Sequence, residues 1–201
     1  MIIIIIAVLI FIVSNIAFRE NQLFYKYQLN AYDFVYKKQY YRIITHAFLH
    51  ADWAHLLINI LVFISFGQAL LAYFQYFWGD SANLIFIVFF VSAIMVSSIY
   101  SIYKNRNNIS YNAIGSSGAV SAVLFASIFF DPWHKIYFFG VLPIPGIVFG
   151  ILYLGYSFYM GKKNQDNIGH DAHFWGAVYG FIFPILIQPN LIGLFTQQLF
   201  A

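Results

Sequence analysis

Residues 115–130 read Gly-Ser-Ser-Gly-Ala-Val-Ser-Ala-Val-Leu-Phe-Ala-Ser-Ile-Phe-Phe, and they are the key to the architecture. Small polar residues open the stretch, and an apolar run without any charge follows. The run is short for a membrane-spanning helix, which needs about 20 apolar residues. We therefore expect a helix over 116–130 that starts below the membrane surface, after a loop that dips inward. Such irregular backbone is tolerated at that depth only where protein or a water-filled cavity surrounds it.

The rest of the chain has the composition of a membrane protein. Of its 201 residues, 62% are hydrophobic and only 8% are charged. Long apolar runs with few charges are typical of membrane helices. Five further apolar stretches cover about 2–18, 54–78, 84–103, 136–159 and 172–188. The sequence therefore predicts an all-α polytopic membrane protein, in which residues 1–201 form one domain of six transmembrane helices.

Two of these stretches have a second interpretation or an irregularity. Residues 2–18 could form a signal peptide, but they lack a charged start and their apolar run is long, which favours a retained helix. Pro143 and Pro145 predict a kink or an irregular entry within 136–159.

The connection Arg19–Thr45 is polar and rich in tyrosine, so we expect it to lie at the bilayer surface.

Charge and residue types exclude several functions. The net charge of +3 comes from 10 basic and 7 acidic residues, which are too few and too scattered for a nucleic-acid-binding surface. The absence of cysteine excludes disulfides, thiol chemistry and thiolate metal sites. A metal site at His46, His50 and His55 is conceivable on spacing. No intramembrane carboxylate or His-Glu-x-x-His signature accompanies these residues, so we expect no metal.

The order of the helices places four polar residues at one membrane face. The helices over 54–78, 116–130 and 172–188 run in the same direction, because one return helix separates each from the next. His55 and Asn59 lie near the start of the first of them, Ser117 at the start of the second and His173 at the start of the third. Ionisable residues inside a membrane are functional by default.

These four residues suit acyl transfer. A serine hydroxyl becomes a nucleophile when a base, usually histidine, takes its proton. The tetrahedral intermediate needs hydrogen-bond donors, which His55, Asn59 and the Ser117 backbone N–H can supply. Asp171 lies two residues before His173, so on a helix the two side chains point in nearly opposite directions. A Ser–His dyad is therefore favoured over a triad.

Small residues at four-residue spacing predict a close approach of two helices. Gly118, Ala122 and Ala126 form one such stripe, and Gly176 and Gly180 form another. Stripes of this kind let membrane helices pack closely. Close packing would bring His173 within hydrogen-bond reach of Ser117.

The ordered motifs resemble those of the rhomboid intramembrane serine proteases over essentially the whole chain. The motifs are His46-Ala47-Phe48-Leu49-His50, His55-Leu56-Leu57-Ile58-Asn59, Gly115-Ser116-Ser117-Gly118, and Ala172-His173-Phe174-Trp175-Gly176 with Gly180. The resemblance implies a six-helix rhomboid-like bundle with Ser117 as nucleophile and His173 as general base. It also implies an oxyanion hole formed by His55, Asn59 and the Ser117 N–H.

The resemblance extends to supporting residues, substrates and location. Arg42 resembles a residue that organises the family's first loop, and His46 and His50 are interpreted as loop-organising or entrance residues. Gly115, Gly118, Gly176 and Gly180 are expected to support the site, the last three through helix packing. Members of the family need no cofactor or metal, and their partners are membrane lipids and protein substrates. They cleave membrane-anchored proteins in or near their transmembrane segments. We expect a multi-pass protein of the bacterial inner membrane whose site opens to the extracytoplasmic side.

Some features of the chain depart from this pattern. Many family members carry tyrosine four residues after the nucleophile, beneath the histidine, whereas this chain has Ser121. Nine of the ten basic residues lie in loops on the face of the site, which by the positive-inside rule would be cytoplasmic. We follow the family on this point. Two other functions stay open: a catalytically inactive rhomboid-like protein that binds membrane clients, and a transporter or channel, which the lack of an internal repeat disfavours.

Overall fold

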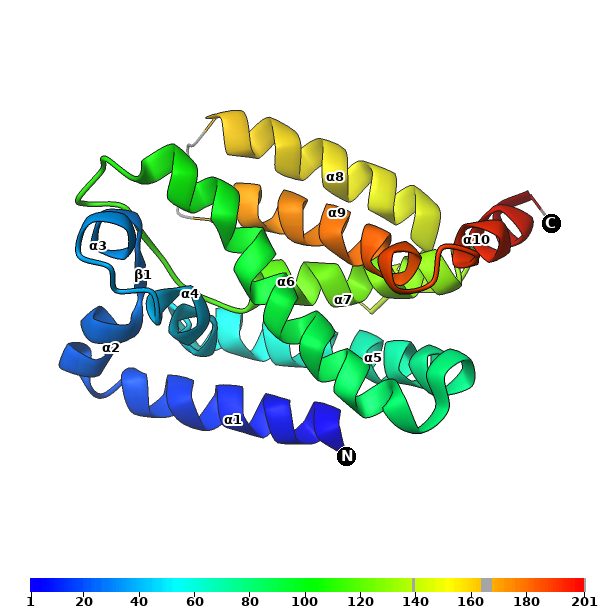
Figure 1. Cartoon of the computed structure of the whole chain (residues 1–201), viewed down its shortest axis with the longest axis horizontal. Helices are drawn as coiled ribbons and strands as arrows, with labels where there is room; N and C mark the ends of the chain where they lie inside the picture. Colours follow the sequence, from blue (N-terminus) through cyan, green and yellow to red (C-terminus); the bar gives the residue numbers. More distant parts are fainter. Residues whose placement is uncertain (139, 164–167, 201) are drawn as a thin grey trace.

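The computed structural model describes residues 1–138, 140–163 and 168–200, and it is mostly helical, as expected. Six long helices make up its body (Figure 1). They are α1 (Ile2–Ala17), α5 (Trp53–Trp78), α6 (Ala82–Asn105), α7 (Ser117–Phe130), α8 (Gly146–Lys163) and α9 (His170–Ile187). In Figure 1, α1 and α8 form opposite edges of the molecule and α6 crosses between them.

Helix α7 is the centre of the packing. It contacts α5, α6, α8 and α9, and every one of its residues from Gly118 to Phe130 is buried. A helix that is hydrophobic all round must be covered by protein or lipid on every side, and here the neighbouring helices cover it. The start of α7 is therefore inside the bundle, where a side chain is held by several helices at once.

One helical stretch in the described part of the chain is long and apolar enough to cross a membrane. It covers Trp53–Asn105 and contains an 18-residue window with a mean hydropathy of 2.4. It consists of α5 and α6 joined by the 3₁₀ turn η2 (Gly79–Ser81). Gly79 has a φ of 50° and provides the reversal. Helices α1, α7 and α10 (Leu191–Phe200) are apolar but shorter. The bundle of six membrane spans thus stays a prediction.

The prediction of a helix over 136–159 is wrong for its first ten residues. Strands β3 (Lys135–Phe138) and β4 (Leu142–Pro145) form an antiparallel hairpin there, with Tyr137 opposite Pro143, and α8 begins only at Gly146. Proline has no N–H to donate within a helix and is tolerated in an edge strand. Pro143 and Pro145 therefore end the helical pattern instead of kinking it. Helix α10 was not expected from the sequence.

The first loop folds over the end of the bundle where α5 and α9 begin (Figure 1). It contains α2 (Asn21–Tyr27), β1 (Leu29–Asn30), α3 (Ala31–Tyr36), α4 (Arg42–Thr45) and the 3₁₀ turn η1 (His46–Phe48). β1 pairs antiparallel with β2 (Asn112–Ala113), which lies just before α7. The loop is therefore linked directly to the segment that leads to Ser117.

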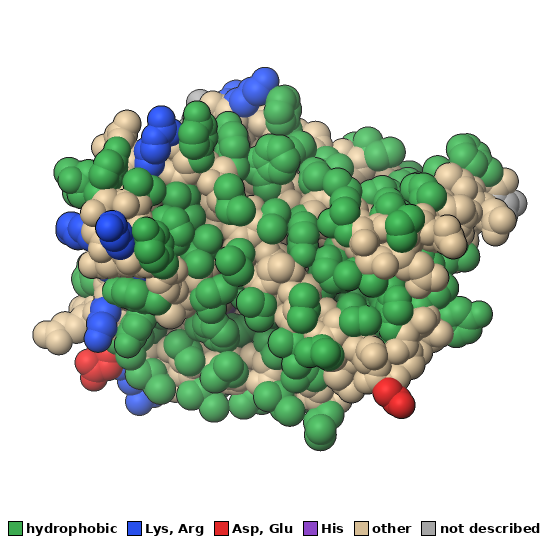
Figure 2. Space-filling model, in the orientation of Figure 1, with side chains coloured by type: hydrophobic (Ala, Val, Ile, Leu, Met, Phe, Trp, Pro, Cys, Tyr) green, Lys and Arg blue, Asp and Glu red, His purple; other side chains and the backbone are tan. Residues whose placement is uncertain are grey.

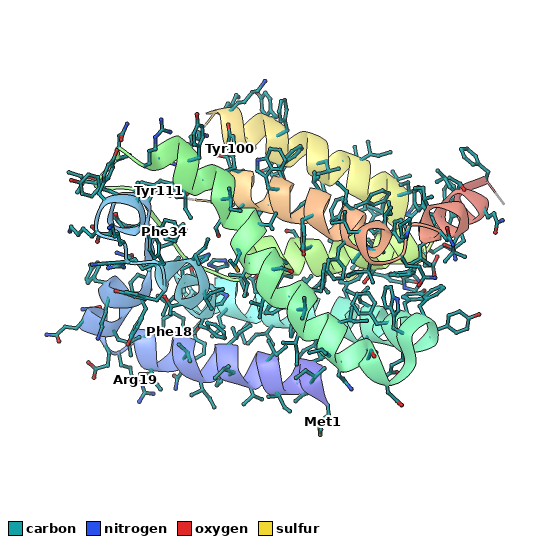
Figure 3. All side chains as sticks on the ribbon, viewed as in Figure 1. Met1, Phe18, Arg19, Phe34, Tyr100 and Tyr111 are labelled. Atoms are coloured by element: carbon teal, nitrogen blue, oxygen red, sulfur yellow. The ribbon has the colours of Figure 1, made fainter. Side chains whose placement is uncertain are left out.

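The two ends of the bundle differ in side-chain character. Most of the visible face carries hydrophobic side chains, whereas lysine and arginine gather at the end with the first loop (Figure 2). The aromatic side chains of Phe34, Tyr100 and Tyr111 lie at this same end (Figure 3). An apolar belt with aromatic and basic residues at its edge is the pattern expected of a protein in a bilayer.

Candidate active site

Ser117 is the first residue of α7, and a glycine turn places it there. Gly115 has a φ of 100°, a conformation that residues with a side chain rarely adopt. Its N–H donates to the carbonyl of His46 over 2.9 Å. A Cβ at Gly115 would stand 2.9 Å from Cε1 of His55, so this position requires glycine for its space as well as for its backbone.

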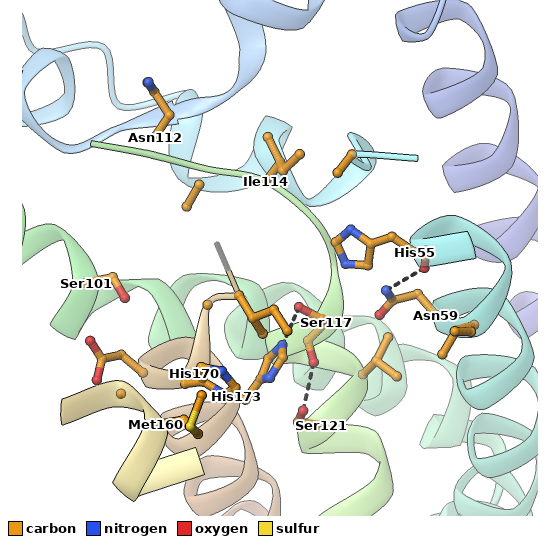
Figure 4. Close-up of a pocket in the computed structure, with 18 of the residues that line it drawn as sticks. His55, Asn59, Ser101, Asn112, Ile114, Ser117, Ser121, Met160, His170 and His173 are labelled. Atoms are coloured by element: carbon orange, nitrogen blue, oxygen red, sulfur yellow. Dashed lines mark hydrogen bonds between the residues drawn. The ribbon is translucent and has the colours of Figure 1, made fainter. Parts of the chain in front are cut away.

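His173 lies in the first turn of α9 and contacts Ser117 directly. Its Nε2 is 2.7 Å from Ser117 Oγ (Figure 4). Both side chains are half-buried. A serine hydroxyl bonded to an imidazole nitrogen at this distance is the arrangement that a base needs in order to take the proton of a nucleophile.

The close approach of α7 and α9 makes this contact possible. A Cβ at Gly176 would overlap the Gly118 carbonyl oxygen, and a Cβ at Gly180 would overlap that of Ala122. Gly118 is confined on its other side, because a Cβ there would be 2.6 Å from Ser97 Oγ of α6. Glycine at these positions lets the two backbones touch, as small residues do between membrane helices.

His55 and Asn59 lie on α5, across the cavity from His173 (Figure 4). Asn59 is buried, and its Nδ2 donates to the carbonyl of His55 over 2.8 Å. An amide nitrogen has two hydrogens, so a second one is available for a ligand. The two residues line a cavity of about 1070 Å³ together with Ser117 and His173. The four residues that helix order placed at one face therefore surround one space.

His50 supports this cavity from behind. It is completely buried, and its ring packs edge-on against that of His55 with centroids 4.9 Å apart. Its Nδ1 is 2.9 Å from Ser14 Oγ of α1, and its Nε2 is 3.4 Å from Ser116 Oγ. Burial, with the neighbouring His55, lowers the pKa of His50 to about 3. The ring is neutral at physiological pH and links α1, α5 and the turn before α7.

His46 and Arg42 organise the first loop. His46 is buried, which lowers its pKa to about 4, and its ring contacts the Arg42 carbonyl at 2.9 Å and Ser98 Oγ of α6 at 3.2 Å. The buried Arg42 guanidinium donates to the carbonyls of Gln28 and Tyr25 over 2.5 and 3.1 Å. It also forms an ion pair with Asp33 at 3.5 Å. These bonds fix the loop.

Asp171 is engaged away from the dyad. Its Oδ2 forms an ion pair with Lys104 Nζ at 2.7 Å, and the same ammonium donates to the Gly161 carbonyl over 3.2 Å. Lys104 lies in the last turn of α6 and Gly161 in α8. Asp171 thus links the ends of three helices at the rim of the cavity.

One residue of the site had no counterpart among the sequence-based candidates. Tyr153 of α8 stacks its ring on that of His173, with centroids 6.3 Å apart and planes inclined by 30°. Its hydroxyl is 2.6 Å from Ser121 Oγ, which donates to the Ser117 carbonyl over 2.8 Å. Nothing in the sequence separates Tyr153 from the other aromatic residues of α8, because its role depends on how that helix is rotated.

Comparison with known proteins identifies the family to which the chain belongs. The chain is similar to RHOMBOID-like protein 12, mitochondrial, of Arabidopsis thaliana, with 25% identity over 154 residues that cover 70% of this chain and 44% of that protein. This chain therefore corresponds to less than half of the relative's length. Nothing in the comparisons supports the expected bacterial inner membrane. The family model described as Rhomboid domain matches residues 37–190, so the chain belongs to the rhomboid family of integral membrane proteins.

Proposed function

We propose that the protein is an intramembrane serine endopeptidase that cleaves transmembrane segments of membrane-anchored proteins. The observation that carries the proposal is the 2.7 Å contact between His173 Nε2 and Ser117 Oγ inside a cavity of about 1070 Å³. The alternative function is that of a catalytically inactive rhomboid-like protein that binds membrane clients. The presence of both groups, in contact, favours the enzyme, because a protein that only binds clients needs neither a nucleophile nor a base.

The reaction follows from the positions of the groups. His173 takes the proton of Ser117 Oγ as the oxygen attacks the carbonyl carbon of the scissile peptide bond. The negative charge that forms on the carbonyl oxygen is stabilised by the Ser117 N–H at the start of α7, with Asn59 and His55 as further donors. His173 then gives the proton to the leaving amine. Water, activated by the same histidine, hydrolyses the acyl-enzyme.

The cavity is suited to a peptide bond and to water. It extends from Ser117 to the polar side chains of Asn105, Asn108 and Asn112 near the first loop, while Phe149 and Leu124 provide apolar walls. Polar residues at the rim allow water to reach a nucleophile that lies among membrane helices. Asn112 also belongs to β2, so the first loop and the cavity rim are one unit.

We propose a multi-pass arrangement in which α1, α5, α6, α7, α8 and α9 cross the membrane and the site opens at the end covered by the first loop. That end carries most of the basic residues (Figure 2), which by the positive-inside rule would favour the cytoplasm. The proposal follows the family, with the site on the extracytoplasmic side. Helix α10 lies at the other end (Figure 1), so a reporter fused after Ala201 should be cytoplasmic. An extracytoplasmic reporter would reverse the orientation.

The activity is tested by reconstituting the purified chain into liposomes with a single-span model substrate. We expect cleavage by the wild type and none by Ser117→Ala or His173→Ala. Substrate that co-purifies with a wild-type chain which leaves it intact would support the inactive, client-binding alternative. Cleavage that persists in Ser117→Ala and stops with a chelator would indicate a metal enzyme instead.

A further inference from the structure

We infer that Tyr153 is a positioning residue for His173, held by α8 and by Ser121. The inference rests on the proposed function and extends it to a residue that does not react. A general base works only if its ring is held in one orientation toward the nucleophile. Among the contacts of the His173 ring, the one with the Tyr153 ring comes from a different helix, α8.

The four side chains form a closed circuit across three helices. His173 Nε2 contacts Ser117 Oγ at 2.7 Å, and the Tyr153 ring packs on the His173 ring at a centroid distance of 6.3 Å. The Tyr153 hydroxyl contacts Ser121 Oγ at 2.6 Å, and Ser121 returns to the carbonyl of Ser117 at 2.8 Å. Nucleophile and base are therefore linked twice, once directly and once through Ser121 and Tyr153.

The direction of the hydroxyl bond follows from counting hydrogens. Ser121 has a single hydroxyl hydrogen, which it donates to the Ser117 carbonyl one turn earlier. With that hydrogen on the Ser117 carbonyl, the Tyr153 hydroxyl is the donor to Ser121. Loss of the Tyr153 hydroxyl leaves Ser121 with its own bond intact, so the ring of Tyr153 matters more for His173 than its hydroxyl does.

The Tyr153 ring is itself supported. Phe149, one turn earlier on α8, stacks on it with centroids 5.8 Å apart, and Phe125 of α7 contacts it at 5.6 Å. Tyr153 also lines the cavity, and its contacts with Phe149 and Phe125 restrict the tilt of its ring on the sides that face these two residues. Tyr153 therefore presents a restrained aromatic surface to the His173 imidazole.

The experiment compares kcat and KM for liposome-reconstituted Tyr153→Leu, Tyr153→Phe and the control Tyr159→Leu. Tyr159 lies on the same helix and is exposed. For Tyr153→Leu we expect kcat to fall about 10- to 100-fold, the size of effect expected from a misplaced catalytic group, with KM changed less than about twofold. Tyr153→Phe should retain most of the wild-type kcat, and Tyr159→Leu all of it. Thermal unfolding shows whether each variant folds, and Tyr153→Met replaces Tyr153→Leu if the latter does not.

The outcomes separate this inference from the proposed function. A wild-type chain without activity refutes the proposed function. An active wild type with a Tyr153→Leu variant of equal kcat refutes the positioning role alone. The same holds if Tyr153→Phe loses as much kcat as Tyr153→Leu, or if Tyr153→Leu changes KM instead of kcat, since a supporting ring predicts neither.

Discussion

Replacing Gly176 with alanine should separate α7 from α9 and disable the dyad. The added Cβ would stand 2.8 Å from the carbonyl carbon of Gly118 and would overlap its oxygen. Carbon atoms in ordinary contact are about 3.5 Å apart, so the helices must part by at least about 0.7 Å. Gly118 follows Ser117, and Gly176 lies one turn after His173. The Ser117–His173 contact of 2.7 Å would lengthen by a similar amount and lose most of its hydrogen bond.

The Gly176→Ala substitution should lower stability and activity by different amounts. Overpacking typically costs about 1–3 kcal/mol of stability, and replacing a helical glycine by alanine returns up to about 1 kcal/mol. The net loss of stability is therefore modest. The loss of activity is larger, because misplacing a catalytic group by about 1 Å can reduce the rate about 100-fold. We expect Gly176→Ala to remain folded and to cleave the model substrate about 10- to 100-fold more slowly.

Gly155→Ala is the matched control. A Cβ at Gly155 on α8 meets no atom within 4 Å, so this variant should keep full activity and unfold at a slightly higher temperature than the wild type. Both variants are compared with the wild type in the liposome cleavage assay and by thermal unfolding in detergent. Cleavage at the wild-type rate by a folded Gly176→Ala would show that the contact of α7 and α9 does not determine the distance between Ser117 and His173.

Three further predictions follow from the site. Burial lowers the pKa values of His46 and His50 in the folded chain to about 4 and about 3. As the pH falls below 6.5 toward about 4, these two histidines become protonated in the unfolded chain before they do in the folded chain. The chain should therefore lose about 3 kcal/mol of stability between pH 7.5 and 5.5, and an unchanged unfolding temperature would contradict this. Asn59→Ala should lower kcat about 100- to 1,000-fold, as loss of an oxyanion donor does, with little change in KM; a change confined to KM would remove Asn59 from the oxyanion hole. Asp171→Asn should keep kcat within about threefold, whereas loss of a triad member costs about 10⁴-fold, because Asp171 pairs with Lys104; a loss near that size would make it a triad member.

The sequence predicted what depends on order and composition. The number and direction of apolar segments placed His55, Asn59, Ser117 and His173 at one end of the bundle, and in the structure these residues line one cavity. That inference needs only the parity of the helices, which survives errors of several residues in their boundaries. The small-residue stripes likewise indicated that α7 and α9 approach closely, because glycine spacing is visible without coordinates.

The remainder depends on three-dimensional detail. An apolar stretch with two prolines fits a kinked helix or a hairpin, and only the pairing of Tyr137 with Pro143 distinguishes them. Ser121 stands where many family members have a tyrosine beneath the histidine, so a ring that supports His173 has to come from another position. Several aromatic residues of α8 could have supplied it. The rotation of α8 selects Tyr153, and a hydropathy pattern does not specify rotation to that accuracy.

The most direct test of Ser117 as the nucleophile is the reaction of the purified chain with a fluorophosphonate probe, with the adduct located by peptide mass spectrometry. We expect one adduct on Ser117 in the wild type, no adduct in Ser117→Ala, and slow labelling in His173→Ala. Equal labelling of the wild type and Ser117→Ala, or an adduct on another serine such as Ser116, would contradict the assignment of Ser117 as the nucleophile.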